Sequence, residues 1–394
     1  MSVVAAAGFV ANGVACGIKD PAAQDLALVT TDDGAPVPAA AVFTQNQVVA
    51  APVIVSRRHL ATTTGRAAGV VVNSGNANAC TGTQGETDAE AMCALTAKAV
   101  GCAADEILVC STGLIGPQLP MDRVAAGIAD VAADRGSGAL AGLAAADAIL
   151  TTDTRRKLSV RRGDDFVVGG MAKGAAMLAP SMATMLAVLT TDAVADAALL
   201  HRMLTEAVAG SFNTVTVDGC TSTNDSVVLL ASGRAGGRAG RSTDPGALRE
   251  AVAYVCYDLA VQMVEDAEGH TKVVRVMVTG AASDADARRA ARKVAESQLV
   301  KCSWYGNDPY WGRIASDLGT SGVPLDPAAL TISYGGVVVS RGCVEVDHDR
   351  TRVAEHMAGD HLHVECHLGT GDGAAAMLTN DLTHAYVDEN MGTS

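Results

Sequence analysis

The chain has 394 residues, of which 49% are apolar and only 18% are charged, and its formal net charge at pH 7 is −14. This composition excludes an intrinsically disordered chain, which would contain fewer apolar and more charged residues. An acidic chain with only 3% aromatic residues also does not fit a nucleic-acid-binding protein, since phosphate contacts need clustered positive charge and single strands need stacking surfaces.

The N-terminal segment carries no positive charge before Lys19, whereas a secretory signal begins with basic residues. Two long uncharged stretches, 34–56 and 174–191, are interrupted by prolines and polar residues, which argues against membrane-spanning helices. The ten cysteines form no CxxC pair and are typical of reduced thiols. We therefore expect a cytoplasmic protein that binds neither membranes nor nucleic acid.

Apolar periodicity predicts alternating strands and helices along most of the chain. In chain order, strands are predicted at 70–72 and 107–109, helices at 88–100 and 121–133, strands at 166–168 and 185–189, a helix at 193–210, a strand at 227–231, a helix at 248–267, a strand at 273–278 and a helix at 285–297. The C-terminal part is mainly β, with strands near 329–334, 336–339, 361–368 and 375–378. This pattern predicts the mixed α/β or α+β class.

The predicted strand at 361–368 places His361, His363, Glu365 and His367 on one face and apolar residues on the other. A zinc site is one interpretation of this face. A half-buried strand with a polar outer face is favoured, because neighbouring residues on one strand rarely complete a tetrahedral shell. No metal site is predicted.

Residues 169–192 combine glycines, Lys173, Pro180 and a threonine, Thr184, at the start of an apolar strand. This arrangement suits a self-cleaving N-terminal nucleophile, in which the Thr184 hydroxyl attacks the Ala183 carbonyl and cleavage frees the Thr184 α-amine. An α-amine of ordinary pKa, about 7.7–8.0, can act as a general base near neutral pH. From the pattern alone, an ordinary threonine in a buried strand is favoured, since threonine is common in strands.

A series of ordered motifs resembles the ornithine acetyltransferase family, also called glutamate N-acetyltransferase, over nearly the whole chain. These motifs are GFVANGVACGIK (8–19), VFTQNQVVAAPV (42–53), NSGNANACTG (73–82), CSTGLIG (110–116), TTDT (151–154), GGMAKGAAMLAPSMATML (169–186), DGCTSTND (218–225), DAEGHTK (266–272), NDPYWGR (307–313) and NDLTHAYVDEN (380–390). The resemblance implies arginine biosynthesis. It implies ping-pong transfer of acetyl from N2-acetylornithine to glutamate through a threonine ester, giving ornithine and N-acetylglutamate.

The resemblance also implies an N-terminal-nucleophile-type sandwich of mixed sheets and helices. Self-cleavage would give an α fragment, 1–183, and a β fragment, 184–394, with a C-terminal subdomain at about 285–394. The fragments would assemble as an α2β2 heterotetramer. No organic or metal cofactor is expected, because the acyl carrier is the Thr184 ester.

The family match assigns site residues by position in this sequence. Thr112 and Gly113 are implied as oxyanion donors, consistent with the hydroxyl and exposed N–H that a Ser-Thr-Gly strand end can offer. The implied substrate-binding residues are Thr151, Lys173, Thr184, Glu268, Asn390 and Ser394. Lys173 is expected to pair with a carboxylate, and Glu268 to face an ammonium group.

Three segments depart from the family pattern, and one of them is Asp20-Pro21, directly after Lys19. The tail after Asn390 is one residue shorter than in the family and lacks its tyrosine, so matching Ser394 to the last substrate contact of the family requires a one-residue gap. Tyr310 stands where the family has Asn. Four readings stay open: this acetyltransferase, with or without acetyl-CoA as a second donor; a secondary-metabolite paralogue with the same chemistry; a threonine N-terminal-nucleophile hydrolase or aminopeptidase; and a non-catalytic amino-acid-binding protein.

Overall fold

The structure is a computed structural model that describes residues 2–19, 23–177, 185–235 and 243–392. The chain forms two compact units. The first comprises Met1–Asn213 and Thr221–Met263, and the second comprises Thr214–Cys220 and Val264–Ser394. The chain thus enters the second unit briefly before β10 and returns to it after α6.

The described residues contain sixteen strands and eleven α-helices. The strands are β1 Phe9–Val14, β2 Leu26–Thr31, β3 Val37–Phe43, β4 Arg66–Ala67, β5 Gly69–Asn73, β6 Ile107–Ser111, β7 Lys157–Arg162, β8 Val167–Lys173, β9 Leu186–Thr191, β10 Ser226–Ala231, β11 Val273–Ala281, β12 Thr331–Tyr334, β13 Val337–Arg341, β14 Val344–Glu345, β15 His361–His367 and β16 Gly373–Asn380. The helices are α1 Ala51–Thr62, α2 Gly82–Val100, α3 Met121–Ala133, α4 Ala139–Ala148, α5 Ala197–Ala209, α6 Pro245–Val264, α7 Asp284–Ala295, α8 Gln298–Tyr305, α9 Trp311–Gly319, α10 Arg350–Met357 and α11 His384–Glu389.

The first unit contains two sheets packed face to face. One has the strand order β1-β2-β5-β6, and the other has the order β4-β3-β10-β9-β8-β7. Val70 and Val72 of β5 share one core with Leu186 and Val188 of β9, whereas Val71 packs into a separate core with α2 and α3. Since successive side chains of a strand point to opposite faces, each sheet is buried on both sides.

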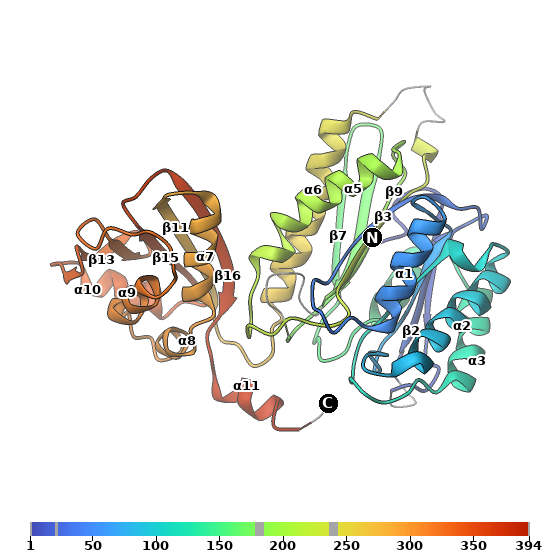
Figure 1. The fold of residues 1–394 in the computed structure, drawn as a ribbon, viewed down its shortest axis with the longest axis horizontal. Coiled ribbons are helices and arrows are strands. Elements are labelled where there is room, and N and C mark those ends of the chain that lie inside the picture. The colour runs from blue at the N-terminus through green and yellow to red at the C-terminus, as the bar shows by residue number, and fades with distance from the viewer. Residues whose placement is uncertain (1, 20–22, 178–184, 236–242, 393–394) are drawn as a thin grey trace. The chain divides into compact units, whose positions relative to one another are not determined.

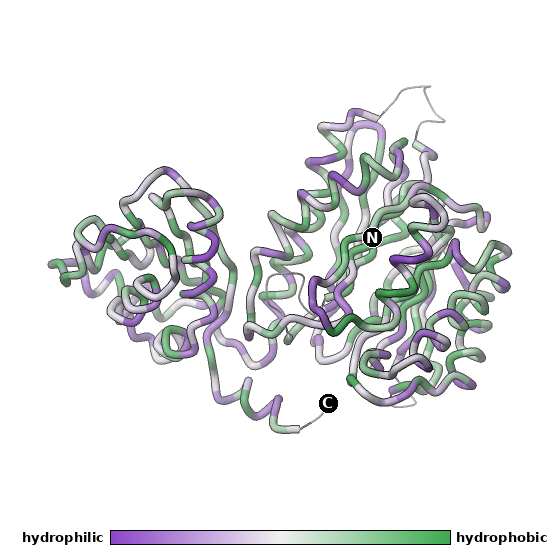
Figure 2. The backbone as a smooth tube through the Cα atoms, viewed as in Figure 1, coloured by the Kyte–Doolittle hydropathy of each residue, from purple (hydrophilic) through white to green (hydrophobic). Residues whose placement is uncertain are grey.

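Helices cover the outer faces of this pair of sheets. Figure 1 shows α1, α2 and α3 on the side of β2, and α5 and α6 on the side of β7 and β9. Much of the backbone of these strands has the green colour of hydrophobic residues in Figure 2, as expected for strands buried on both faces. The first unit is therefore a helix–sheet–sheet–helix sandwich, which confirms the predicted fold class.

The second unit is a six-stranded mixed sheet with the order β14-β13-β12-β15-β11-β16. Its core joins Val274 and Val276 of β11 to alanines of α7 and to Trp304 of α8. Strand β15 confirms the predicted alternation, because its four polar side chains are exposed and its three apolar ones are buried. Among the residues that the structure describes, no group of three or more His, Cys, Asp or Glu side chains is placed to hold a metal ion.

Some predicted boundaries were wrong, and some elements were missed. Helix α2 begins at Gly82 rather than residue 88, because its first turn is polar and exposed and so carries no apolar periodicity. Helix α1 was missed inside the stretch that contains Pro52, although proline is well tolerated in the first turn of a helix.

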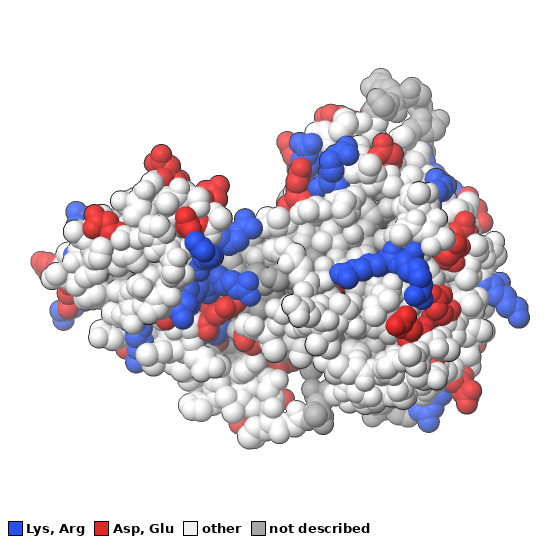
Figure 3. Space-filling view, viewed as in Figure 1, with Lys and Arg blue, Asp and Glu red and all other residues white. Residues whose placement is uncertain are grey.

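Charged side chains are sparse on the visible surface. Figure 3 shows basic and acidic groups in small mixed clusters separated by broad uncharged areas, as the low charged fraction predicts. No helix within the described ranges is both long and apolar enough to cross a membrane.

Candidate active site

The segment that follows β6 carries Thr112 and Gly113. Strand β6 is fully buried and pairs in parallel with β5, so the two strands end side by side. The Thr112 N–H donates to the Asn73 carbonyl at 3.0 Å, and the Ser111 hydroxyl donates to the Asn73 side chain at 2.5 Å. These bonds fix the strand end and hold the largely buried Thr112 in place.

Gly113 occupies a position that only glycine fits. Its φ is +130°, and a Cβ there would lie 2.3 Å from the backbone carbon of Gly75. Within the described part of the chain, no acceptor is recorded for the Gly113 N–H. An N–H without an acceptor, beside a threonine hydroxyl, is the donor arrangement that an oxyanion needs.

A buried carboxylate, Asp153, connects two of the predicted substrate residues of this unit. Asp153 accepts hydrogen bonds from the Thr151 N–H at 3.1 Å and the Gly174 N–H at 2.7 Å. Its oxygens also pair with Lys157 Nζ at 2.5 Å and with Lys173 Nζ at 3.7 Å. The structure thus brings Thr151 and Lys173 together, and Lys173 is not the isolated charge that the sequence indicates.

These contacts change the pKa of Asp153. Burial alone would raise the pKa of this carboxyl, but the charges of Lys173 and Lys157 and the hydrogen bonds from Lys157 and Gly174 lower it to about 2. Asp153 is therefore ionised at neutral pH. A buried ionised carboxylate between two lysines fixes the position of both ammonium groups.

A second buried acid lies beside the segment of the predicted nucleophile. The Asp225 carboxylate accepts a hydrogen bond from the Met185 N–H at 3.0 Å, and Met185 directly follows Thr184 in the sequence. Burial raises the pKa of Asp225 well above its usual range, and neither the Met185 hydrogen bond nor the charge of Lys173 offsets this effect.

Asn224, next to Asp225, joins the site loops. Its side-chain amide donates to the Ala77 carbonyl at 2.6 Å and to the Ser111 carbonyl at 2.9 Å. These two bonds tie the start of β10 to the loop after β5 and to the end of β6. Asn224, Asp225 and Asp153 were not predicted as site residues, although all three lie inside motifs that carry the family resemblance.

In the second unit, two predicted substrate residues contact each other. The Asn390 side-chain amide donates to the Glu268 carboxylate at 2.8 Å. Glu268 also lines a small cavity of about 100 Å³ together with Lys301 and Tyr386. Ala183, Thr184 and Ser394, which complete the predicted set, lie outside the described residues.

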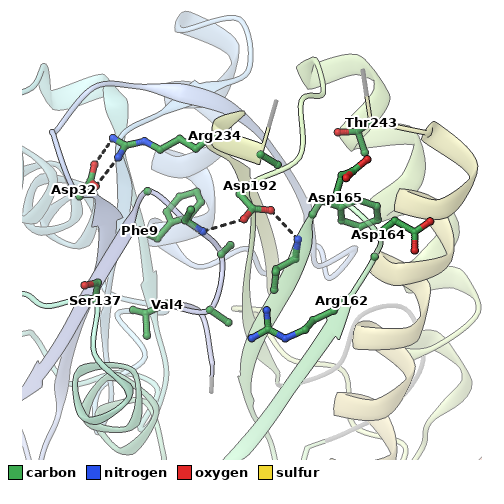
Figure 4. A pocket seen from close by; sticks show the side chains of 18 residues that line it. Val4, Phe9, Asp32, Ser137, Arg162, Asp164, Asp165, Asp192, Arg234 and Thr243 are labelled. Carbon is green, nitrogen blue, oxygen red and sulfur yellow. Dashed lines mark hydrogen bonds and ion pairs between the residues drawn. The ribbon is translucent and has the colours of Figure 1, made fainter. Parts of the chain in front are cut away.

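A cavity of about 860 Å³ lies elsewhere in the first unit, between the N-terminal segment and the β7–β8 turn (Figure 4). Several of its charged groups have partners. Arg234 binds Asp32 and Asp33, and Asp192 accepts the N–H groups of Ala7 and Val167. None of the predicted site residues that the structure describes lines this cavity.

Comparisons with known proteins agree with the ordered motifs. A sequence profile of the ArgJ family matches residues 10–392. The "Arginine biosynthesis bifunctional protein ArgJ" of Mycobacterium tuberculosis is 47% identical over 406 residues, which cover 100% of this chain and 96% of that protein. The protein of the same name from Thermobifida fusca is 45% identical over 394 residues, which cover both chains completely.

Among solved structures, the ornithine acetyltransferase of Mycobacterium tuberculosis complexed with ornithine is 48% identical to this chain. It covers 45% of this chain and 94% of its own, with a TM-score of 0.43. The profile match and the full-length sequence relatives decide the assignment, and the chain belongs to the ArgJ family.

Proposed function

We propose that this protein transfers the acetyl group of N2-acetylornithine to glutamate in arginine biosynthesis, with Thr184 as the nucleophile. The names of the full-length relatives and of the solved structure support this activity. The observation that carries it is the gathering of an oxyanion-type pair, Thr112–Gly113, and a lysine-rich substrate region around Asp153 within one compact unit.

The first step is self-cleavage between Ala183 and Thr184, giving fragments 1–183 and 184–394. The Thr184 hydroxyl adds to the Ala183 carbonyl carbon, and the acyl group moves from nitrogen to oxygen. Water then hydrolyses the ester, which leaves a carboxylate on Ala183 and a free α-amine on Thr184. This amine is the general base for the later steps, since its ordinary pKa lies near neutrality.

Transfer then runs through an acetyl ester. The Thr184 oxygen attacks the acetyl carbonyl of N2-acetylornithine, and its proton passes through the α-amine to the departing amine of ornithine. The amine of glutamate next attacks the ester and regenerates the hydroxyl. In both tetrahedral intermediates, Thr112 and Gly113 stabilise the oxyanion, and such a donor contributes about 3 kcal/mol to the lowering of the barrier.

Lys173, with Thr151, binds the substrate carboxylate, and Glu268 and Asn390 complete the substrate contacts. Acetyl-CoA is proposed as a second donor, because the relatives are named bifunctional. We further propose that the fragments assemble as α2β2 in the cytoplasm, without a cofactor.

The test combines intact-mass analysis with an acceptor assay. Wild-type protein should show two fragments divided before Thr184, and it should convert N2-acetylornithine and glutamate into ornithine and N-acetylglutamate. Thr184→Ala should stay a single chain without activity, whereas Thr184→Ser should keep both reactions at reduced rates, since serine also offers a hydroxyl.

Acetate released independently of glutamate would instead identify a hydrolase. Full turnover by Thr184→Ala would exclude Thr184 as the nucleophile. Parallel assays with acetyl-CoA as the donor test the second activity.

A further inference from the structure

Lys19, a residue with no assigned role, is held in a rigid loop of the first unit. The buried Asp25 carboxylate accepts four consecutive backbone N–H groups, from Cys16 at 2.6 Å, Gly17 at 3.0 Å, Ile18 at 2.6 Å and Lys19 at 3.0 Å. The Asp25 carbonyl also accepts the Ser74 N–H at 2.9 Å. The backbone of Lys19 is thereby fixed against the loop that follows β5.

The Lys19 side chain runs between the two parts of the candidate active site. The aliphatic part of the Lys19 side chain lies over Gly75, since a Cβ added to Gly75 would be 2.5 Å from Lys19 Cγ. Gly75 in turn packs against Gly113. At its far end, Lys19 Nζ donates to the Leu150 carbonyl at 2.9 Å, one residue before Thr151. Lys19 therefore reaches from the oxyanion pair to the substrate residues.

Charged groups cluster around this position. Lys19 and Lys173 lie near each other and near Asp153, which pairs with Lys157 and Lys173, and Asp25 accepts four backbone N–H groups. An ammonium has three donors, and Leu150 O is the one acceptor recorded for Lys19 among the described residues. A partly buried ammonium group with one acceptor is stabilised when an anion pairs with it.

We propose that Lys19 is a second cationic anchor, acting with Lys173 on the α-carboxylate of both the acetyl donor and the acetyl acceptor. This inference rests on the proposed function. A ping-pong enzyme uses one site for both substrates, and the α-carboxylate is the anionic group that N2-acetylornithine and glutamate share. Lys19 thereby fixes the shared end of both substrates relative to the oxyanion donors.

Lys19→Met tests this role, because methionine keeps the stem over Gly75 and removes only the charge. The probe pair is N2-acetylornithine and N-acetyl-1,4-diaminobutane, which is the same donor without its carboxylate. In wild-type protein, kcat/KM should favour the donor with the carboxylate. Loss of a charged contact should shrink this preference about tenfold or more in Lys19→Met. KM should rise for both N2-acetylornithine and glutamate.

Lys98→Met, which alters an exposed lysine of α2, is the matched control and should leave the preference unchanged. Lys19→Arg should restore much of the preference. An unchanged preference in correctly cleaved Lys19→Met would overturn the proposal, and so would a rise in KM for glutamate alone, since that would place Lys19 on the side-chain carboxylate. Failure of the proposed function is distinguishable, because wild-type protein itself would then transfer no acetyl.

Discussion

The carboxylate of Asp225 accepts the backbone N–H of Met185 at 3.0 Å, so a fully buried acid holds the residue that follows the predicted nucleophile. Because burial raises the pKa of Asp225 well above its usual range, the folded protein binds this proton more tightly than the unfolded chain does. The stability of the fold at the start of β9 therefore depends on the pH through the protonation of Asp225.

The first prediction concerns this coupling. A carboxyl whose pKa is raised by folding costs stability as the pH rises above its unfolded value, about 3.9, towards the folded value. Asp225→Asn can still accept the Met185 N–H but does not titrate. Its melting temperature relative to wild type should therefore increase between pH 4 and pH 8. Asp130→Asn, at an exposed position of α3, is the control, and parallel curves for wild type and Asp225→Asn would contradict the prediction.

The second prediction concerns Asp153, whose pKa is lowered to about 2. Its stabilising effect is fully present above its unfolded pKa and is lost as the pH falls towards 2. Asp153→Asn removes a buried counter-charge that Lys157 and Lys173 share, and it should reduce the free energy of unfolding by about 3–5 kcal/mol at pH 7.

Urea unfolding measures this change, and the double variant Asp153→Asn with Lys157→Met is its control. The double variant should lose less free energy of unfolding than the two single variants lose together, because it removes both members of one ion pair. Strict additivity of the two substitutions would refute the assigned pairing.

The third prediction separates backbone strain from loss of the oxyanion donor. Gly113→Ala would place a Cβ 2.3 Å from the Gly75 backbone, displace the Gly113 N–H and lower kcat about 100- to 1,000-fold. Gly116→Ala also has positive φ, at +108°, but its Cβ would meet nothing within 4 Å. Steady-state kinetics should therefore show a much smaller loss for Gly116→Ala, and equal losses would show that strain alone explains the effect.

The fourth prediction tests the Glu268–Asn390 contact. Glu268→Gln removes a negative charge and should raise KM for N2-acetylornithine by about 10- to 100-fold. Asn390→Ala keeps that charge and removes only its hydrogen-bond partner, so the rise should be smaller. If Asn390→Ala had the larger effect in the same assay, the charge of Glu268 would not be the binding determinant.

Much of the sandwich could be predicted from apolar runs, such as those of β5 and β9, which are buried on both faces. The Asp153 cluster could not, because it depends on strand register. Lys157 of β7 pairs opposite Ala172 of β8, and this hairpin brings the segment before β7, which carries Asp153, to the end of β8 at Lys173. The sequence pattern does not predict β7, and a one-residue shift in register would turn every side chain of that strand to the other face of the sheet.

Asp225 illustrates a different limit. The motif DGCTSTND identifies it as part of the family resemblance, but a carboxyl's burial and its contact with Met185 depend on the parallel pairing of β9 with β10. Such pairing joins residues 40 positions apart and leaves no local pattern.

The strand order of the six-stranded sheet has a consequence for purification. A cut before Thr184 would assign β9 and β10 to one polypeptide and the flanking β3 and β8 to the other. The inner pair would then be hydrogen-bonded on both edges to strands of the other fragment, so the fragments could separate only by unfolding. Cut and uncut protein should therefore migrate alike in native gels and size-exclusion columns, and only denaturing methods would reveal which form a preparation contains.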